Sequence, residues 1–340
     1  MKGIITIKML VLASFLVFNI STLQVKANQN IINIPMDYPT LSEALASGNI
    51  HPGDTVHVWS GIYVENPVIN VSDIKIIGQP GYGAVINPLL PGPCITIVAS
   101  GVSIMMLTIQ DTNAFANDVG ITIKARQTSI GQCKIYRNRI LDFSFGVKID
   151  NSSNNEIIGN DISGCTNHQA SAAIWITNTK ATCNRISGNE IGRISPCSYG
   201  IAIQSASGNT IVFNNFWNTQ MSPAAWISPG SINAWDDQTI QKGNWWGNGA
   251  PTPYIIDHSN IDHYCHPSFF NWSTYPWDVN RDCRGDMQDI SPIAKAFGTE
   301  WPMEKWNPIC DITGMEGFPD NQVNMMDISL AAKNFGWKYP

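Results

Sequence analysis

One short pattern constrains the fold more than any other feature of this chain: Ile, two residues, Asn, one residue, then Ile or Phe. It recurs at steps of 22, 29 and 25 residues, over Ile135–Ile140, Ile157–Ile162, Ile186–Ile191 and Ile211–Phe216. Apolar residues also alternate in the segments between, which predicts strands with one buried face. Several short strands in each unit of roughly 20 to 30 residues predict a solenoid.

The solenoid that fits this pattern best is a right-handed parallel β-helix, in which each unit forms one coil. Successive coils would stack at about 4.8 Å, with Ile at equivalent positions filling the interior. The repeated asparagines would then form a ladder at one turn, where each amide can bond the next coil. They are Asn138, Asn160, Asn189 and Asn214. A leucine-rich repeat is the rival solenoid, but the sequence has no LxxLxL pattern.

Composition supports a β-rich fold and excludes some functions. Charged residues make up 14% of the chain, below the quarter that is usual, and the abundant Ile and Asn disfavour a helical bundle. The net charge is −6, whereas a nucleic-acid-binding protein needs a basic face for phosphates.

The N-terminus has the pattern of a signal peptide. Lys2 and Lys8 precede an apolar run over Met9–Ile20, which is too short to span a bilayer of about 30 Å. We expect cleavage after Ala27, and hence a signal peptide over residues 1–27 and a secreted or cell-surface protein with no membrane span in the mature chain. The alternative is a membrane anchor.

The segment that precedes the repeats carries a resemblance to a known fold. A strand at Ile31–Ile34 is followed by a short helix at Pro39–Leu45, then by Gly53–Val58, Gly61–Tyr63 and an IxIIG segment at 74–78. This order of motifs resembles the start of many pectin-lyase-like β-helix proteins. The resemblance implies that the segment caps the solenoid.

The segment that closes the solenoid carries a second resemblance. Gly243–Gly247, Thr252–Asp257 and Asn260–Tyr264 are similar to the end of the periplasmic copper-binding accessory β-helix family. The two resemblances together cover roughly residues 30 to 266. The family name accompanies the fold more widely than it accompanies copper, so fold alone does not establish metal chemistry.

The C-terminal part contains an internal duplication. Residues 286–298 and 324–336 are identical at eight of 13 positions, at an offset of 38. Each copy reads as a loop followed by an amphipathic helix that ends in Phe-Gly. We therefore expect a β-helix over residues 28–275 and a second, small α-helical domain over 276–340.

The loop before each helix has the spacing of an EF-hand-like calcium loop, in which oxygen ligands converge on a hard cation. The first set of candidate ligands is Asp278, Asn280, Asp282, the carbonyl of Arg284, Asp286 and Asp289. The second set is Asp311, Thr313, Asp320, the carbonyl of Gln322, Asn324 and Asp327. With Asp at the last ligand position of each loop, the duplicated unit resembles a dockerin domain. This resemblance implies calcium as a cofactor and a cohesin-type scaffold or cell-surface partner. The alternative is a pair of Asp-rich surface loops.

Three features depart from that loop pattern. Cys283 stands where the loop calls for Gly with its positive φ, and Gly285 stands where an apolar residue is usual. The second loop spans 17 residues rather than 12, so 314–317 must bulge outward, at a small loop-closure cost. A Cys283–Cys310 disulfide could join the two halves; the alternative is two free buried thiols.

A catalytic site would require paired carboxylates on an outer strand face. The residues between Asn and Ile in successive repeats are Arg139, Asp161, Glu190 and Asn215. Asp161 and Glu190 would lie about 5 Å apart, one coil from each other, which suits retaining glycoside hydrolysis. Arg139 beside Asp161 is equally consistent with an outward ladder of salt bridges.

Two further sets of residues suggest other chemistry. Gln110–Thr112 and Asp142–Gly146 resemble motifs of pectin methylesterases, although the second is also explained as part of an ordinary coil. The densest cluster of metal-ligand types suits copper or zinc, with surface histidines in a terminal loop as the alternative. It comprises Asp257, His258, Asp262, His263, Cys265 and His266.

The sequence thus leaves three functions open. The first is a secreted module that recognises a polysaccharide or cell-surface glycan, for which the 12 Trp residues would supply flat apolar platforms. Its dockerin-like tail would dock it to a partner. The second is a polysaccharide lyase or glycoside hydrolase with its site on the β-helix flank, and the third is a copper-handling accessory protein.

Overall fold

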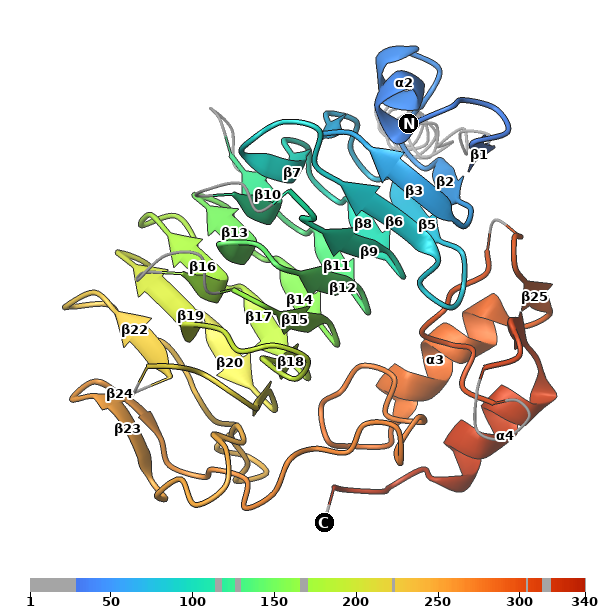
Figure 1. Ribbon diagram of the computed structural model, residues 1–340. Helices are drawn as coiled ribbons and strands as arrows, with labels where there is room; N and C mark the ends of the chain where they lie inside the picture. Colours follow the sequence, from blue (N-terminus) through green and yellow to red (C-terminus); the bar gives the residue numbers. More distant parts are fainter. Residues whose placement is uncertain are drawn as a thin grey trace, which may run out of the picture.

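The computed structural model describes residues 29–339 except 114–117, 126–129, 166–170, 222–223, 304 and 314–318. The expected signal peptide and the expected bulge at 314–317 lie outside the described residues. Within them the chain forms a right-handed parallel β-solenoid followed by a segment with two helices (Figure 1). No helix among the described residues is long and apolar enough to cross a membrane.

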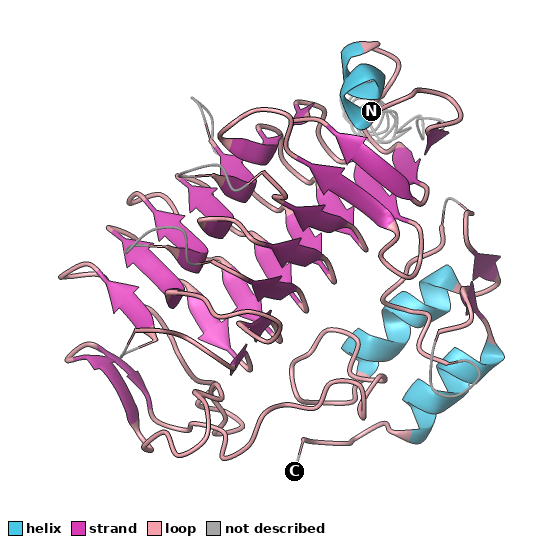
Figure 2. Cartoon of the chain, in the orientation of Figure 1, coloured by secondary structure: helices cyan, strands magenta, loops and turns pink. Residues whose placement is uncertain are grey.

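Three parallel sheets make the walls of the solenoid (Figure 2). Sheet A contains β1 (Ile31–Ile34), β2 (Thr55–Val58), β5 (Lys75–Gly78), β8 (Ser103–Met105), β11 (Lys134–Tyr136), β14 (Glu156–Ile158), β17 (Arg185–Ser187) and β20 (Thr210–Val212). Sheet B contains β3 (Gly61–Val64), β6 (Ala84–Asn87), β9 (Thr108–Gln110), β12 (Arg139–Leu141), β15 (Asp161–Ser163), β18 (Glu190–Ile191) and β21 (Asn215–Phe216). Sheet C contains β4 (Val68–Ile69), β7 (Pro93–Ile97), β10 (Val119–Lys124), β13 (Phe145–Asp150), β16 (Ala172–Thr177), β19 (Tyr199–Gln204) and β22 (Ala225–Ile227).

The repeated isoleucines fill the interior and the repeated asparagines form the predicted ladder. Ile135 pairs with Ile157 and Ile157 with Ile186 across sheet A, and all three are fully buried. At the turn between sheets A and B, the Asn160 side-chain oxygen accepts the backbone N–H of Asn138 at 2.9 Å. In the same way, the backbone N–H of Asn160 donates to the Asn189 side chain, and that of Asn189 donates to the Asn214 side chain. The ladder is therefore confirmed.

A second asparagine ladder was missed by the sequence reading. Asn155 donates its backbone N–H to the Asn184 side chain at 2.9 Å, and Asn184 donates to Asn209 at 3.1 Å. Asn209 donates in turn to Asn233. The signal was present, because Asn155, Asn184 and Asn209 each stand five residues before a member of the first ladder. From Asn138 and Asn155 onward, the two ladders satisfy buried backbone N–H groups at two corners of the coils.

Each end of the solenoid is covered. The helix α2 (Leu41–Ala46) begins at an N-cap, Thr40, and buries Leu41 and Leu45 against the first coils. At the other end the Trp246 ring stacks on Phe216 and on Tyr254, with ring centroids 4.2 Å apart in both pairs. The antiparallel hairpin of β23 (Tyr254–Asp257) and β24 (Asn260–Asp262) follows. Such covers protect the open edges of the last coil.

The C-terminal segment has a two-fold internal repeat in its structure. The helices α3 (Met287–Ala296) and α4 (Met325–Lys333) both begin with a capping box. The strand β25 (Thr299–Glu300) follows the first helix and pairs with β26 (Gln322–Val323) in the second loop. Correspondingly, Trp337 and Lys338, which follow the second helix, pair with residues 284 and 285 of the first loop. The duplicated sequence is thus a duplicated structure.

The C-terminal segment packs against the outer face of sheet A. Ile77 and Met105 of the solenoid share an apolar cluster with Ile293 and Trp306 of the segment. Figure 1 shows α3 lying beside the strands of this sheet. The sequence does not predict this contact between sheet A and the C-terminal segment, because the repeat pattern ends before the segment begins.

Candidate functional site

The column of polar side chains predicted on the outer face of sheet B is present. Strand register places Arg139 beside Asp161, Asp161 beside Glu190, and Glu190 beside Asn215. Because adjacent parallel strands lie about 4.8 Å apart, Asp161 and Glu190 are close neighbours. The alternation of inward Ile and outward polar residues in β12, β15 and β18 produces this arrangement.

Glu190 is held in place by two donors. Its carboxylate accepts the Asn215 side-chain amide at 3.0 Å and the indole N–H of Trp217. Burial raises the pKa of Glu190, and the bond from Trp217 and the charge of Arg281 oppose that rise. A positioned carboxylate with a raised pKa holds its proton to a higher pH than a solvated one.

Asp161 and Arg139 do not form the ion pair that a salt-bridge ladder would require. The Asp161 carboxylate accepts the Ser163 hydroxyl at 3.1 Å, and burial raises the pKa of Asp161. The Arg139 guanidinium instead lies over the Tyr82 ring, 4.6 Å from its centroid. The salt-bridge interpretation of this pair is therefore wrong, because Arg139 turns away to the aromatic ring.

These residues line a cleft of about 540 Å³ between sheet B and the C-terminal segment, which we call the corner cleft. The solenoid supplies one wall, the connecting residues 269–276 a second, and the start of the second C-terminal loop a third. Its side chains combine aromatic rings, arginines and carboxylates. They include Tyr82, Arg137, Arg139, Asp161, Glu190, Arg193, Trp217, Phe269, Trp272, Arg281 and Asp311.

Sequence reasoning found the polar column of sheet B in this cleft but not most of its other side chains. Arg193, Phe269 and Arg281 lie outside the repeat and converge on the cleft only through the fold. Arg281 belongs to the first C-terminal loop, yet its guanidinium donates to the Gly188 carbonyl at a turn of the solenoid. Its own carbonyl accepts the Ser187 hydroxyl at 3.0 Å. Nothing in the local sequence pairs position 281 with positions 187 and 188.

The first C-terminal loop directs carboxylates inward. Asp278 accepts the backbone N–H groups of Asp282 at 3.0 Å and Cys283 at 2.9 Å. Asp289 accepts those of Val279 at 2.8 Å and Asp286 at 2.9 Å. Cys283 adopts a φ of +66°, so the loop takes the turn that normally calls for Gly.

The second loop repeats this arrangement. Asp311 accepts the N–H groups of Asp320 at 3.2 Å and Asn321 at 2.8 Å, and Asp327 accepts that of Ile312 at 2.8 Å. Asn321, the counterpart of Cys283, has a φ of +67°. Gly285 departs from the pattern for a steric reason, because a Cβ there would lie 2.4 Å from the Asn334 carbonyl oxygen.

Four of these carboxylates are almost fully buried without a cationic partner. Asp278, Asp289, Asp311 and Asp327 are each 2% exposed or less, and none forms an ion pair with a described residue. Burial, reinforced by neighbouring aspartates, raises the pKa of Asp278 well above its usual value and that of Asp311 to about 7. Uncompensated buried carboxylates and nearby amide and carbonyl oxygens form a donor set that fits a hard divalent cation.

In the described conformation, however, the carboxylate oxygens are engaged with backbone N–H groups. No group of three or more His, Cys, Asp or Glu among the described residues is arranged to hold a metal ion. This also applies to the histidine cluster suggested for copper. His263 contacts Asp236 with 3.0 Å between Nδ1 and the carboxylate, whereas the His266 ring faces the Ser268 carbonyl. The cluster does not converge.

Two smaller predictions have clear outcomes. Cys283 and Cys310 are both buried free thiols and belong to different apolar clusters, so of the two alternatives the pair of free buried thiols is present and the disulfide is not. The fragments that resemble esterase motifs do meet, because the Gln110 amide donates to the Asp142 carboxylate at 3.0 Å in the neighbouring coil.

Comparison with known proteins supports the fold of the solenoid. Residues 95–250, less than half of the chain, match the family described as periplasmic copper-binding protein (NosD). No curated protein matches the chain in sequence.

Three solved structures are similar to this chain at low sequence identity and low TM-score. An alginate lyase from Paenibacillus sp. str. FPU-7 is 15% identical, with a TM-score of 0.42, and the match covers 67% of this chain and 93% of that one. Pectin methylesterase from carrot is 13% identical, with a TM-score of 0.37 and coverage of 73% and 90%. A pectin methylesterase variant in complex with a hexasaccharide is 12% identical, with a TM-score of 0.31 and coverage of 59% and 81%.

Proposed function

We propose that this chain is an exported β-helix module that binds a polysaccharide or cell-surface glycan in the corner cleft. The observation that supports this most is the joint presence of partly exposed aromatic rings and fixed polar groups in one concave site. Trp217 and Phe269 lie 4.7 Å apart between ring centroids, and Phe269 is 41% exposed. Aromatic faces pack on the apolar faces of sugar rings, while Arg193 and Glu190 can bond hydroxyl groups.

Glycan binding can be tested with one variant and a matched control. Phe269→Ala removes a ring of the corner cleft, whereas Phe297→Ala removes an exposed Phe from the C-terminal segment. We expect Phe269→Ala to weaken binding to a responsive polysaccharide by about tenfold on an array followed by calorimetry, and Phe297→Ala to leave it unchanged. Equal affinities for both variants and the parent would count against the corner cleft as the binding site.

We further propose that the C-terminal segment binds calcium through its two loops and attaches the module to a cohesin-type partner. The support is the duplicated loop-helix with its buried, uncompensated carboxylates. Asp278, Asp282 and Asp289 would hold one ion with Asn280, Asp286 and the Arg284 carbonyl. Asp311, Asp320 and Asp327 would hold another with Thr313, Asn324 and the Gln322 carbonyl. Calcium would supply the positive charge that these carboxylates lack.

Calorimetric titration of the full chain with calcium tests this proposal. We expect binding in the parent, loss of one site in Asp278→Ala and loss of the other in Asp311→Ala. Absence of binding at millimolar calcium would refute the calcium sites, and with them the proposed mode of docking.

A polysaccharide lyase or glycoside hydrolase is the second candidate function. It is favoured by one observation: Asp161 and Glu190 are adjacent, half-buried carboxylates whose pKa values are both raised by burial. In this proposal the protonated carboxyl would act as general acid and its neighbour as nucleophile, with Arg139 at the edge of the cleft. Release of reducing ends or unsaturated uronides from a polysaccharide panel, abolished in Glu190→Gln, would separate an enzyme from a binding module.

A further inference from the structure

A second cavity lies on the other side of Arg137 and Arg281, between sheet A and α3, and we call it the basic pocket. Its volume is about 430 Å³, and it shares Arg137, Gly159 and Arg281 with the corner cleft. Strand register places one row of its side chains side by side on successive strands of sheet A. The row is Lys75, Ser103, Lys134, Glu156 and Arg185.

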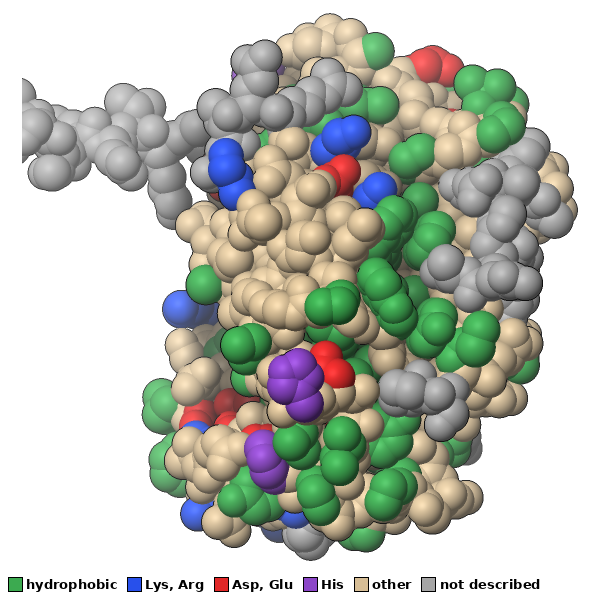
Figure 3. All heavy atoms as spheres, turned by 90° about the vertical axis from the view of Figure 1, so that its left-hand side faces the viewer, with side chains coloured by type: hydrophobic (Ala, Val, Ile, Leu, Met, Phe, Trp, Pro, Cys, Tyr) green, Lys and Arg blue, Asp and Glu red, His purple; other side chains and the backbone are tan. Residues whose placement is uncertain are grey.

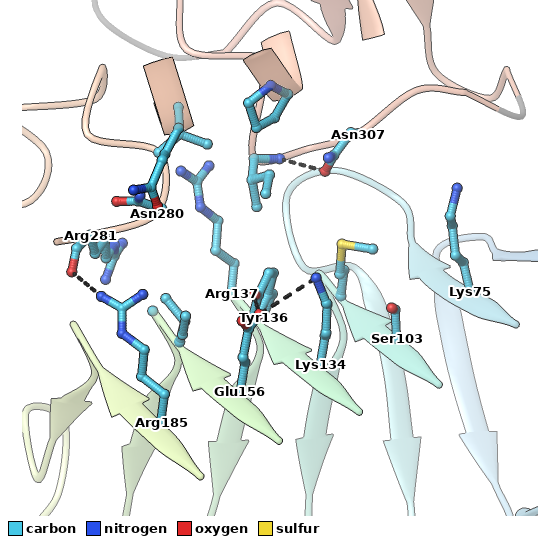
Figure 4. A pocket seen from close by; sticks show the side chains of 17 residues that line it. Lys75, Ser103, Lys134, Tyr136, Arg137, Glu156, Arg185, Asn280, Arg281 and Asn307 are labelled. Atoms are coloured by element: carbon cyan, nitrogen blue, oxygen red, sulfur yellow. Dashed lines mark hydrogen bonds and ion pairs between the residues drawn. The ribbon is translucent and has the colours of Figure 1, made fainter. Parts of the chain in front are cut away.

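Positive charge dominates this pocket. Five cationic side chains line it against one carboxylate, that of Glu156, and Figure 4 shows them spread along the pocket, with Arg185 and Arg281 at one end and Lys75 at the other. Glu156 is already engaged, because it lies 3.6 Å from the Lys134 ammonium and accepts the Tyr136 hydroxyl. The cationic residues are Lys75, Lys134, Arg137, Arg185 and Arg281. On the face in Figure 3, by contrast, basic side chains lie next to acidic ones, and most of the surface is apolar or neutral.

The arginines of the pocket lack carboxylate partners. Arg137 donates to the Pro308 carbonyl at 3.1 Å, Arg281 to the Gly188 carbonyl, and Arg185 to the Arg281 carbonyl at 3.5 Å. Among the described residues, no carboxylate oxygen lies within 4.0 Å, the limit for an ion pair, of any of the three guanidinium groups. Neutral carbonyls fix the direction of a guanidinium without neutralising it, and carboxylates that act on these arginines, such as Glu190 on Arg281 and Asp282 on Arg185, lie beyond ion-pair distance. Burial and the neighbouring Arg137 lower the pKa of Arg281 to about 10, so it still carries its charge at neutral pH.

Some uncharged polar groups of the pocket are also donors. The Ser103 hydroxyl and the side-chain amides of Gln288 and Asn307 line the same space as the cations, whereas the Asn280 amide already donates to Asp282. Four net positive charges, five minus one, exceed what a single carboxylate of a ligand would neutralise. Guanidinium groups and amides in this arrangement suit oxyanions, which accept several charge-assisted hydrogen bonds at once.

We propose that the basic pocket binds oxyanionic groups carried on a saccharide, as sulfate esters or several carboxylates would present them, and so selects anionic glycans over neutral ones. The saccharide part rests on the glycan binding proposed for the corner cleft, which joins the basic pocket at Arg137 and Arg281. The pocket is composite: the solenoid supplies Lys75, Lys134 and Arg185, and the C-terminal segment supplies Arg281. A solenoid without its C-terminal segment would have only part of it.

The test uses calorimetry on the full chain with three probes: a sulfated oligosaccharide, its desulfated counterpart and inorganic sulfate. Lys75→Gln is the main variant, because the Lys75 side chain forms no hydrogen bond or ion pair with a described residue and its loss should not disturb the fold. Arg185→Gln is the second variant. Lys180→Gln, which removes an exposed charge at a turn beyond sheet C, is the matched control.

We expect the parent to bind the sulfated oligosaccharide about tenfold more tightly than the desulfated one. Lys75→Gln and Arg185→Gln should each remove much of that difference and leave affinity for the desulfated probe unchanged, while Lys180→Gln behaves as the parent. Equal affinity for both oligosaccharides, or equal effects of Lys75→Gln and Lys180→Gln, would overturn the proposal.

Two other outcomes separate this inference from the function on which it rests. If inorganic sulfate binds and Lys75→Gln abolishes that binding, while neither oligosaccharide binds, the oxyanion pocket stands and the glycan function fails. If a single-stranded DNA oligonucleotide binds as tightly as the sulfated oligosaccharide with the same response to Lys75→Gln, the pocket responds to charge alone and its selectivity for saccharides is overturned.

Discussion

The solenoid and the C-terminal segment handle buried polar groups in opposite ways. In the solenoid, Asn160 and its equivalents are uncharged, and each amide both donates and accepts between coils. In the C-terminal segment, Asp278 and Asp311 are carboxylates that only accept. A neutral ladder is complete without any other species, whereas buried carboxylates are stable only when protonated or matched by a cation. The stability of the solenoid should therefore not depend on a bound ion, whereas that of the C-terminal segment should depend on pH and on bound cations.

The largest expected effect tests the solenoid side of this comparison. In Asn160→Leu, the Asn138 N–H and the Ile135 carbonyl lose their partners inside the protein. We expect the free energy of unfolding to fall by about 2–4 kcal/mol, with or without calcium, because buried groups would be left unpaired. Chemical denaturation measures this. Asn30→Leu, at an exposed Asn, is the control, and an unchanged unfolding midpoint for Asn160→Leu would contradict the ladder's role.

Much of the solenoid could be predicted because its information is local and repeated. Ile135, Asn138 and Ile140 recur with a fixed internal spacing, and stacking of identical coils converts that spacing directly into register. The second ladder, through Asn155 and Asn184, follows the same rule and could have been found by searching for Asn five residues earlier. The segments between the repeats differ in length, so they carry no fixed spacing from which their structure could be predicted.

The second prediction concerns the C-terminal segment and calcium. Calcium should raise the free energy of unfolding of the full chain by about 2.7 kcal/mol for each occupied site when its free concentration is one hundred times the dissociation constant. The double variant Asp278→Asn, Asp311→Asn should lose this effect, while Asp150→Asn, in the solenoid, should keep it. Differential scanning fluorimetry with calcium and with EDTA measures the shift. A calcium-dependent shift that survives in the double variant would place the ion elsewhere.

The third prediction concerns the interface where the two regions meet. His57 on the outer face of β2 is fully buried under Trp301, with ring centroids 4.4 Å apart, and neither ring nitrogen has a hydrogen-bond partner among the described residues. Burial lowers the pKa of His57 to about 4. Because the folded-state pKa lies below the unfolded value of about 6.5, stability is retained above pH 6.5 and is lost as the pH falls toward 4.

His57→Phe should remove this part of the acid sensitivity. Between pH 7 and pH 4.5 the parent should lose about 2 kcal/mol more than His57→Phe. His258→Phe, at an exposed histidine, should behave as the parent. Denaturation curves at a series of pH values give the comparison, and identical pH profiles for His57→Phe and the parent would show that Trp301 does not keep this ring buried in solution.

The corner cleft could be predicted only in part, for a reason that this interface illustrates. Asp161 and Glu190 follow from the repeat, since register alone places them together. Arg281 and Phe269 reach the cleft because the C-terminal segment packs on the solenoid, and that contact depends on non-repeated side chains such as Trp301. A sequence repeat predicts which side chains are neighbours along the solenoid axis. A contact between the solenoid and the unrelated C-terminal segment produces no repeat, so the sequence pattern does not predict it.

The smallest expected effect on stability concerns the carboxylates of the corner cleft. Asp161→Asn keeps the shape of a half-buried side chain and removes a charge whose pKa burial has raised, so we expect a change within about 0.5 kcal/mol. Glu190→Gln should cost more, because the Trp217 indole and the Asn215 amide both donate to its carboxylate.

If the cleft only binds glycan, both variants should keep most of the affinity of the parent. If it cleaves glycan, turnover should fall by orders of magnitude while the unfolding midpoint of Asp161→Asn stays in place. Parallel measurements of unfolding, binding and product release on these two variants therefore distinguish a catalytic pair of carboxylates from a pair in a cleft that only binds glycan.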